Sequence, residues 1–159
     1  IALRFSSEYS CDIILIQSGQ NAKFMPSGKD IITANSTIMI IGEEEHLEVF
    51  AKANKQRNLK ATMTTKPESL RSYMLRDNLP EDLQLCVLSI PIDKGNPLLG
   101  KSIRSSNIRE TCNCMVIGLE RKGITITAPN VSLLLEEKDL LWILGKPRVI
   151  RELIMEDLI

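Results

Sequence analysis

The predicted fold rests on residues 112–128, whose sequence is CNCMVIGLERKGITITA. Residues 112–121 form an apolar run long enough for a β-strand, and Lys122-Gly123 is a two-residue turn signal. Residues 124–128 then alternate apolar and polar side chains, as a half-buried strand does. The stretch therefore predicts an antiparallel hairpin, and the remaining elements are placed around it.

The flanking segments extend this hairpin into a β-α-β-β-β-α unit. Before it, residues 83–92 form an apolar strand and residues 98–104 a short helical segment. After it, residues 139–145 form the last strand, and Pro147 fits the first turn of a helix. That helix carries an apolar stripe made of Val149, Ile150, Leu153, Ile154 and Leu158. The expected fold class is α+β, with largely antiparallel sheets and flanking helices.

The first third of the chain repeats this unit at a spacing of 103 residues, which takes Cys11 to Cys114. The same spacing pairs four further identical residues: Ile14 with Ile117, Pro26 with Pro129, Ile40 with Ile143 and Gly42 with Gly145. Its predicted elements are strands over 12–17, 22–25 and 36–42 and a helix from Glu43. We therefore expect two tandem copies of one fold.

The first copy has no counterpart of residues 81–103, because Ile1 falls opposite Arg104. Since the chain begins without Met, we expect it to be cut from a longer protein that supplies the missing opening strand and helix upstream. Residues 59–65 are a poorer candidate for covering that sheet edge.

Three segments follow from this arrangement. Residues 1–56 are the incomplete first copy, residues 57–80 a linker with a possible bridging helix over 67–76, and residues 81–159 the second copy. The strands are apolar on both faces, so we expect a helix on one face and another module on the other. That module is the other copy or a second chain; the alternative is simply a well-packed small domain.

Composition limits the function. The 159 residues carry 20 basic and 20 acidic side chains and 4% aromatic residues, which argues against a nucleic-acid platform. No apolar run approaches the about 20 residues that span a bilayer. The sequence holds no Gly-x-Gly-x-x-Gly motif and no catalytic constellation, so we expect neither NAD binding nor enzymatic activity.

The four cysteines, Cys11, Cys86, Cys112 and Cys114, all lie in apolar runs predicted to be strands. Cys112 and Cys114 are expected on one face of the same strand, where they cannot easily form a disulfide. We therefore expect reduced cysteines within the core and no metal site.

Motifs across the second copy point to a family. They are NPLLGKSI at 96–103, NIR at 107–109, CMVIGLER at 114–121, Ala128-Pro129, and KDLLWILG at 138–145. Residues 81 to about 155 resemble the C-terminal domain of the regulator of potassium conductance family, called RCK-C or TrkA-C. The first copy resembles it more loosely, through residues 9–16, Pro26 and residues 37–42.

The resemblance implies a regulatory, ligand-sensing and dimerising domain pair on the cytoplasmic side of the cell membrane. It would belong to a monovalent cation transporter, either a cation/proton antiporter or a potassium transport protein. Its partners would be the membrane domain of the same polypeptide, a second copy of the chain and a small molecule, with no nucleic acid. The alternatives are the effector-binding domain of a transcription regulator and a pure dimerisation module.

The resemblance also implies a ligand site. Family contacts to cyclic di-AMP map to Ile108, Arg109, Glu110 and Pro129. The planar guanidinium of Arg109 suits phosphate oxygens, which it can bind through two parallel hydrogen bonds. Two departures keep cyclic di-AMP, another ligand and no ligand open as alternatives. Met115 stands where the family has Asn, and Ser6 and Asp12 stand at the Arg and Asn positions of the first copy.

Overall fold

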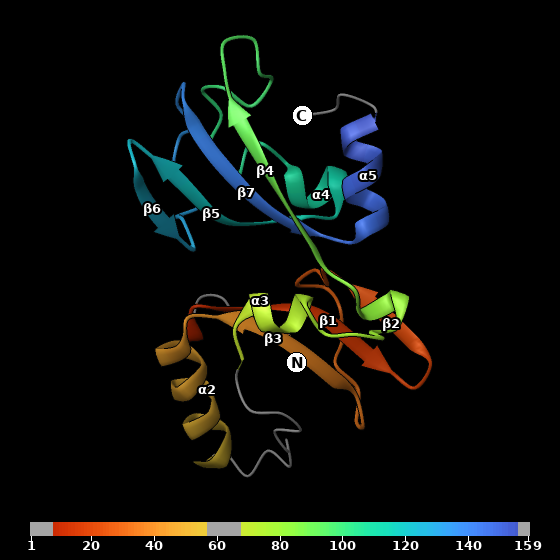
Figure 1. Ribbon diagram of the computed structural model, residues 1–159. Helices are drawn as coiled ribbons and strands as arrows, with labels where there is room; N and C mark the ends of the chain where they lie inside the picture. Colours follow the sequence, from red (N-terminus) through yellow and green to blue (C-terminus); the bar gives the residue numbers. More distant parts are fainter. Residues whose placement is uncertain (1–7, 57–67, 156–159) are drawn as a thin grey trace. The chain divides into compact units, whose positions relative to one another are not determined.

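The computed structural model describes residues 8–56 and 68–155, and the chain divides between residues 75 and 76 into two compact units (Figure 1). Each unit contains one antiparallel sheet and flanking helices. The predicted α+β class with antiparallel sheets is therefore confirmed. The segment boundaries at 56/57 and 80/81 stay predictions.

The second unit contains a four-stranded sheet in the order β4-β7-β5-β6. Its elements are the 3-10 helix η1 (Glu81–Leu83), β4 (Cys86–Ile92), α4 (Ile108–Cys112), β5 (Met115–Arg121), β6 (Ile124–Thr127), β7 (Asp139–Gly145) and α5 (Pro147–Met155). The predicted hairpin joins β5 to β6. Lys122 and Gly123 both have positive φ, 53° and 76°, as a turn matched to the strand twist requires.

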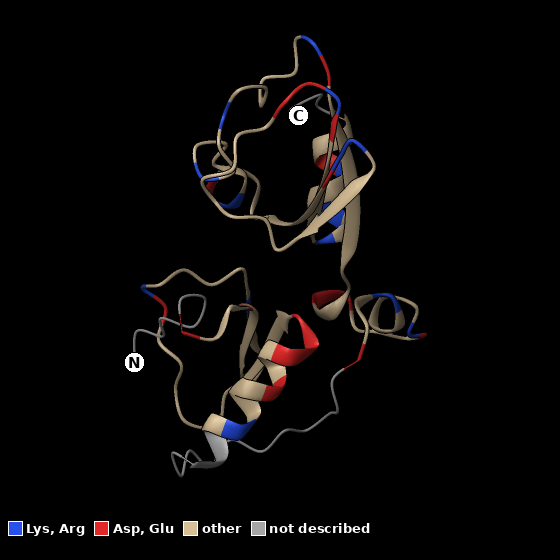
Figure 2. Cartoon of the chain, turned by 90° about the vertical axis from the view of Figure 1, so that its left-hand side faces the viewer, with Lys and Arg blue, Asp and Glu red and all other residues tan. Residues whose placement is uncertain are grey.

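The first unit contains a three-stranded sheet in the order β2-β1-β3. Its elements are β1 (Cys11–Ser18), β2 (Asn21–Phe24), β3 (Thr37–Gly42), α2 (Glu44–Gln56) and α3 (Leu70–Met74). In Figure 2 the start of α2 has the red colour of Asp and Glu, and the acidic residues of its first turn, Glu44 and Glu45, complement the helix dipole. Within the helix predicted over 67–76 the structure has the shorter α3. Its N-cap is Ser69, whose side chain accepts a hydrogen bond from the Ser72 N–H.

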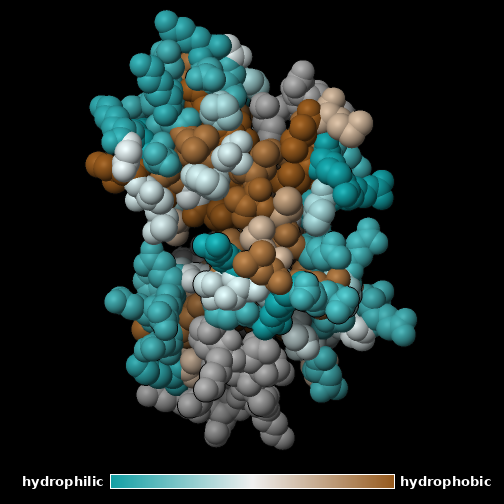
Figure 3. Space-filling view, in the orientation of Figure 1, coloured by the Kyte–Doolittle hydropathy of each residue, from teal (hydrophilic) through white to brown (hydrophobic). Residues whose placement is uncertain are grey.

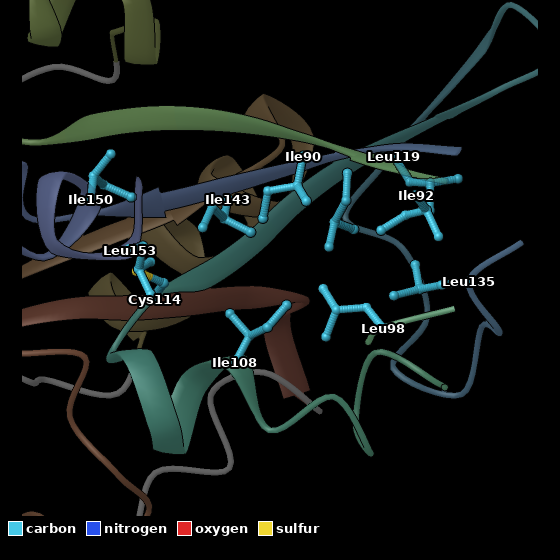
Figure 4. Close-up of a cluster of buried hydrophobic side chains, with 11 residues drawn as sticks. Ile90, Ile92, Leu98, Ile108, Cys114, Leu119, Leu135, Ile143, Ile150 and Leu153 are labelled. Carbon is cyan, nitrogen blue, oxygen red and sulfur yellow. The ribbon is translucent and has the colours of Figure 1, made fainter. Parts of the chain in front are cut away.

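The core of the second unit lies between one face of its sheet and the helices α4 and α5 (Figure 4). Strands β4 and β7 contribute alternate residues and β5 contributes Leu119, while α5 contributes Ile150 and Leu153 and α4 contributes Ile108. The buried cluster consists of Ile90, Ile92, Leu98, Ile108, Cys114, Leu119, Leu135, Leu141, Ile143, Ile150 and Leu153. Burial of these side chains is the main source of stability for the unit.

The two units share one strand register at the 103-residue spacing. In the first, β1 pairs with β3 from Cys11↔Gly42 to Gln17↔Thr37, with an irregularity between Ile13 and Leu15. In the second, β5 pairs with β7 with the irregularity between Val116 and Gly118, which are the equivalent positions. The hairpin registers also coincide, Leu15↔Phe24 corresponding to Gly118↔Thr127. A shared bulge is a specific feature, so the units have the same sheet topology apart from β4.

Backbone conformations repeat with the strands. Positive φ angles occur at four equivalent pairs: Ser10 (51°) and Asn113 (50°), Gly19 (61°) and Lys122 (53°), Met25 (47°) and Ala128 (44°), and Asn35 (65°) and Lys138 (73°). The left-handed region is uncommon for residues other than glycine. Its recurrence at matched positions shows that the connecting loops, as well as the strands, follow one plan.

Two predictions about the second unit are wrong. Residues 98–104 form turns rather than a helix, because the N–H groups of Gly100 and Ile103 donate to the carbonyls of Leu135 (2.9 Å) and Leu133 (3.0 Å) instead of to a preceding helical turn. Cys112 ends the helix α4 instead of lying in a strand with Cys114. Asn113, in the left-handed conformation, ends that helix and allows the chain to enter β5.

All four cysteines are free, as predicted. Cys11 and Cys114 are buried at equivalent positions, Cys11 against Gly42 at the end of β3 and Cys114 against Gly145 at the end of β7. Burial, with a smaller effect from Cys112, raises the pKa of the Cys114 thiol to about 12. The suggested edge-covering segment, residues 59–65, lies outside the described residues.

Candidate functional site

The predicted ligand residues divide into an exposed pair and a buried pair. Ile108 points from α4 into the core, where its side chain is 4% exposed (Figure 4). Arg109 and Glu110 follow it on the same helix and are exposed. Pro129 is buried. Ile108 and Pro129 therefore fix the backbone, whereas Arg109 and Glu110 offer charged groups to solvent.

Backbone hydrogen bonds join the segment before α4 to the segment after Pro129. The Arg104 N–H donates to Val131 O at 2.8 Å, the Ile103 N–H donates to Leu133 O at 3.0 Å, and an isolated bridge links Ser102 to Leu134. These bonds hold the approach to Arg109 beside the loop that carries Pro129. The structure therefore joins the residues shortly before Arg109 to those shortly after Pro129.

Hydroxyl groups further order the approach to α4. The Ser102 N–H donates to Ser105 Oγ (2.9 Å), and the Ser105 N–H donates to Ser102 Oγ (3.1 Å). The Ser106 hydroxyl donates to the carbonyl of Ile103 at 2.6 Å. Such local bonds favour a turn over a helix, and they present Arg109 from a defined backbone.

An ion cluster, which the sequence did not predict, anchors the other side of this loop. Arg121 on β5 donates through Nε and Nη2 to both carboxylate oxygens of Asp139, at 2.8 and 2.7 Å, and through Nη1 to Glu136 at 2.6 Å. The same guanidinium donates to the carbonyl of Leu134 at 2.7 Å. One side chain thus ties β5 to both ends of the segment 134–139.

Asp139 is the buried member, with its side chain 1% exposed. Burial alone would raise the pKa of this carboxyl, but the hydrogen bonds from Arg121 and the Glu136 N–H outweigh it and lower the pKa below its usual value. The hydrogen bond to Asp139 in turn raises the pKa of Arg121. In the sequence, the only sign that these residues matter was that Arg121 and Asp139 stand in two separate family motifs. That they form an ion pair could be seen only in the tertiary structure.

The residues that depart from the family pattern in the two units, Met115 and Asp12, occupy equivalent positions in the two sheets. Met115 pairs with Leu144, and Asp12 occupies the equivalent position opposite Ile41. Pro26, the counterpart of Pro129, is also buried. Ser6 lies outside the described residues.

Within residues 8–56 and 68–155, no three His, Cys, Asp or Glu side chains are grouped so that they could hold a metal ion. In the same part of the chain, none of the helices has the length and apolar character needed to cross a membrane.

Comparison with known proteins identifies a domain. Residues 87–156 match the family model of the TrkA-C domain. No curated protein sequence matches the chain.

Several solved structures are similar. The RCK_C domain dimer of S. agalactiae BusR in complex with c-di-AMP is 22% identical, with 43% of this chain and 91% of that chain covered and a TM-score of 0.39. The C domain of the potassium transport protein KtrA in complex with c-di-AMP is 21% identical, with coverages of 45% and 82% and a TM-score of 0.41. BusR in complex with busA-promotor DNA is 17% identical, with coverages of 79% and 71% and a TM-score of 0.42.

The family match takes in nearly every element of the second sheet and its helices, from the second residue of β4 to the end of α5. It also contains Arg109 and Pro129 and the ion cluster around Asp139. The resemblance found in the sequence over residues 81 to about 155 is therefore confirmed. Residues 87–156 of this chain form a TrkA-C domain.

Proposed function

We propose that this chain is a regulatory module of a monovalent cation transporter, located on the cytoplasmic side of the membrane, and that its TrkA-C domain senses a small phosphate-bearing ligand. The TrkA-C match over residues 87–156 is the observation that carries the proposal. The membrane domain of the same polypeptide would be the partner that responds.

Arg109 would bind the ligand. Its exposed guanidinium offers parallel N–H groups to phosphate oxygens, and the buried Ile108 beside it fixes the direction of the helix. Glu110 would accept a hydrogen bond from an amino or hydroxyl group of the same ligand. Ile108 and Pro129 act through the backbone, because both are buried.

The module would act as a homodimer. Figure 3 shows apolar side chains at the surface of the second unit, between hydrophilic ones. Large exposed residues of this unit include Ile124 (67%), Leu134 (56%), Ile154 (57%) and Met155 (84%). Exposed apolar groups in this number favour association. Ligand binding would regulate transport if it favours one arrangement of the two subunits over another.

The ligand experiment uses cyclic di-AMP as the probe in a calorimetric titration of the whole chain. Removing the Arg109 guanidinium in Arg109→Ala should weaken binding about 10-fold to 100-fold, the usual effect of losing charge-assisted hydrogen bonds. Arg76→Ala, which removes another exposed arginine of the same unit, should leave the affinity unchanged. Equal loss in both variants, or no binding by the parent chain, would refute the site.

A second experiment tests the attachment to a transporter. The gene is sequenced on both sides of the region that encodes this chain. Several apolar stretches of about 20 residues would support the transporter. A basic helix-turn-helix in their place would instead make the chain the effector domain of a transcription regulator.

A further inference from the structure

In the part of the chain that the structure describes, one edge of strand β3 in the first unit is free. In the second unit the equivalent strand β7 is central and pairs with β5 on one side and with β4 on the other. In the first unit β3 pairs with β1, and among the described residues no strand pairs with its other edge (Figure 1). The position that β4 fills in the second unit is therefore not filled by any described residue of the first unit.

The open position leaves apolar side chains incompletely covered. Leu141 and Ile143 of β7 are 0% exposed, because Leu88, Ile90 and Ile92 of β4 share their face of the sheet. Their equivalents in β3, Ile38 and Ile40, are only half-buried. The greater exposure of Ile38 and Ile40 is therefore what the lack of a fourth strand beside β3 would produce.

The edge of β3 also lacks the features that normally prevent strand addition. Its sequence is TIMIIG, without charge or proline. The opposite edge strand, β2, is only four residues long and carries Lys23, and the edge strand β4 carries Pro91. Short strands, lysines and prolines protect sheet edges, so β3 is the unprotected edge of the first sheet.

We propose that the free edge of β3 binds an extended segment with the side-chain pattern of β4, antiparallel to β3. The segment would place apolar side chains at four alternate positions, as Cys86, Leu88, Ile90 and Ile92 do in β4. Applying the β4–β7 register to the first copy sets the Leu88 position opposite Ile40 and the Ile90 position opposite Ile38. The mode is strand addition, in which main-chain hydrogen bonds bind and alternate side chains select.

If β3 paired with β3 of a second chain, fewer of the exposed apolar side chains of the first unit would be covered than by a segment like β4. In the second unit the chain beyond β4 also fills the core, through Leu98 and through Ile103, which packs against it. A second β3 brings no such continuation, since β3 ends at Gly42 and is followed by the helix α2. A segment like β4 and the chain that follows it supplies both a strand beside β3 and an apolar residue equivalent to Leu98 for the core.

The position of Pro91 indicates which N–H groups of β4 face β7 and which face away from it. Proline has no N–H and lies in an edge strand with its nitrogen turned away from the neighbouring strand, so Pro91 and, by alternation, Val87 and Ser89 face outward. Leu88 and Ile90 therefore bond to β7, opposite Ile143 and Leu141. In the first unit, the N–H groups of Ile38 and Ile40 face the free edge.

The test adds a synthetic peptide with the sequence of residues 83–104 to the whole chain and measures amide hydrogen exchange by NMR. Without peptide, the amides of Ile38 and Ile40 should exchange faster than those of Met39 and Ile41. With peptide, exchange at Ile38 and Ile40 should slow by about 10-fold or more.

Two matched peptides serve as controls. N-methylation at the Leu88 and Ile90 positions removes the donors that face β3 and should abolish the protection. N-methylation at the Val87 and Ser89 positions modifies the outward side and should leave the protection intact. Equal behaviour of the two peptides, or protection of Leu141 and Ile143 in place of Ile38 and Ile40, would overturn the proposal. So would slow exchange at Ile38 and Ile40 in a chain that sedimentation shows to dimerise without peptide.

Discussion

The two units differ in the polar side chains that meet at the start of the last strand of each sheet. In the second, Arg121, Glu136 and Asp139 form an ion cluster beneath the loop that precedes β7. At the equivalent positions the first unit has Ser18, Thr33 and Ser36. Their hydroxyl groups bond to one another, Ser18 Oγ to Ser36 Oγ at 2.7 Å and Thr33 Oγ1 to Ser36 Oγ at 3.0 Å.

This comparison shows that the fold specifies where polar groups meet, while the sequence of each copy specifies which groups they are. A turn in the chain recurs at this place, since the Asp139 N–H donates to Glu136 O at 3.2 Å and the Ser36 N–H donates to Thr33 O at 3.3 Å. Buried ions are costly to separate, whereas hydroxyl groups are cheaper both to bury and to lose. The second unit should therefore be the more sensitive to single substitutions at this place.

The largest expected effect is that of Asp139→Asn. The change leaves Arg121 without its bidentate partner and should reduce the free energy of unfolding of the second unit by about 3–5 kcal/mol. Ser36→Ala, the matched change in the first unit, removes neutral hydrogen bonds and should cost about 1 kcal/mol. Urea unfolding followed by residue-resolved hydrogen exchange measures both units in one chain. Similar losses in the two units would contradict the comparison.

Replacing the whole ion cluster should cost less than breaking it. The triple variant Arg121→Ser, Glu136→Thr and Asp139→Ser installs the hydroxyl set of the first unit in the second. Because no unpaired charge remains buried, we expect a loss of about 1–2 kcal/mol, below that of Asp139→Asn alone. The same unfolding experiment compares the two variants. A triple variant as unstable as Asp139→Asn would mean that the ions contribute more than the shared geometry does.

A matched glycine pair compares the packing of the two units. A Cβ on Gly145 would lie 2.6 Å from Cys114 Sγ and 3.1 Å from Ile150 Cδ1, and a Cβ on Gly42 would lie 2.7 Å from Cys11 Sγ. Gly145→Ala should destabilise the second unit by about 1–3 kcal/mol. Gly42→Ala should cost less, because the three atoms nearest to its new Cβ all belong to Cys11 and no second side chain is among them.

The contact with sulfur provides the control for this pair. Cys114→Ala removes the atom nearest to the new Cβ, so the double variant with Gly145→Ala should be more stable than the sum of the two single changes predicts. Additive costs in thermal unfolding would show that the close Cys114–Gly145 contact is not what excludes a side chain at this position.

Acidification should reveal the smallest difference. The pKa of Asp139 is lowered in the folded state, so its contribution is complete above the ordinary aspartate pKa of about 3.9 and disappears as the pH falls through the folded value. Unfolding measured from neutral pH to below about pH 4 should show the second unit losing stability. The triple variant should lose less, because it lacks this carboxyl.

In the first unit Asp30 also has a lowered pKa, through its hydrogen bond with Lys23, but that pair is exposed and screened. An unchanged slope in the triple variant would exclude Asp139 as the source.

Local patterns predicted the elements that depend on local forces. The Lys122-Gly123 turn, the last strand over 139–145 and the helix at Pro147 all lie where alternation, turn residues and helix-start signals placed them. The short helix was misplaced for a physical reason. A helix was predicted over residues 98–104, but the N–H groups of Gly100, Ile103 and Arg104 donate to carbonyls of residues 131–135, far along the chain. The candidate site could be predicted as residues, since Arg109 and Pro129 stand in motifs, but not as a geometry.

By itself, the sequence determined the strands, the duplication at a spacing of 103 residues and the TrkA-C character of residues 87–156, because periodicity and spacing are properties of the chain. Only the tertiary structure decided which side chains meet. It paired Arg121 with Asp139, directed Ile108 inward and Arg109 outward, and left the edge of β3 open among the described residues. These features depend on strand register and on sheet order, in which one added or missing strand changes the burial of every side chain beside it.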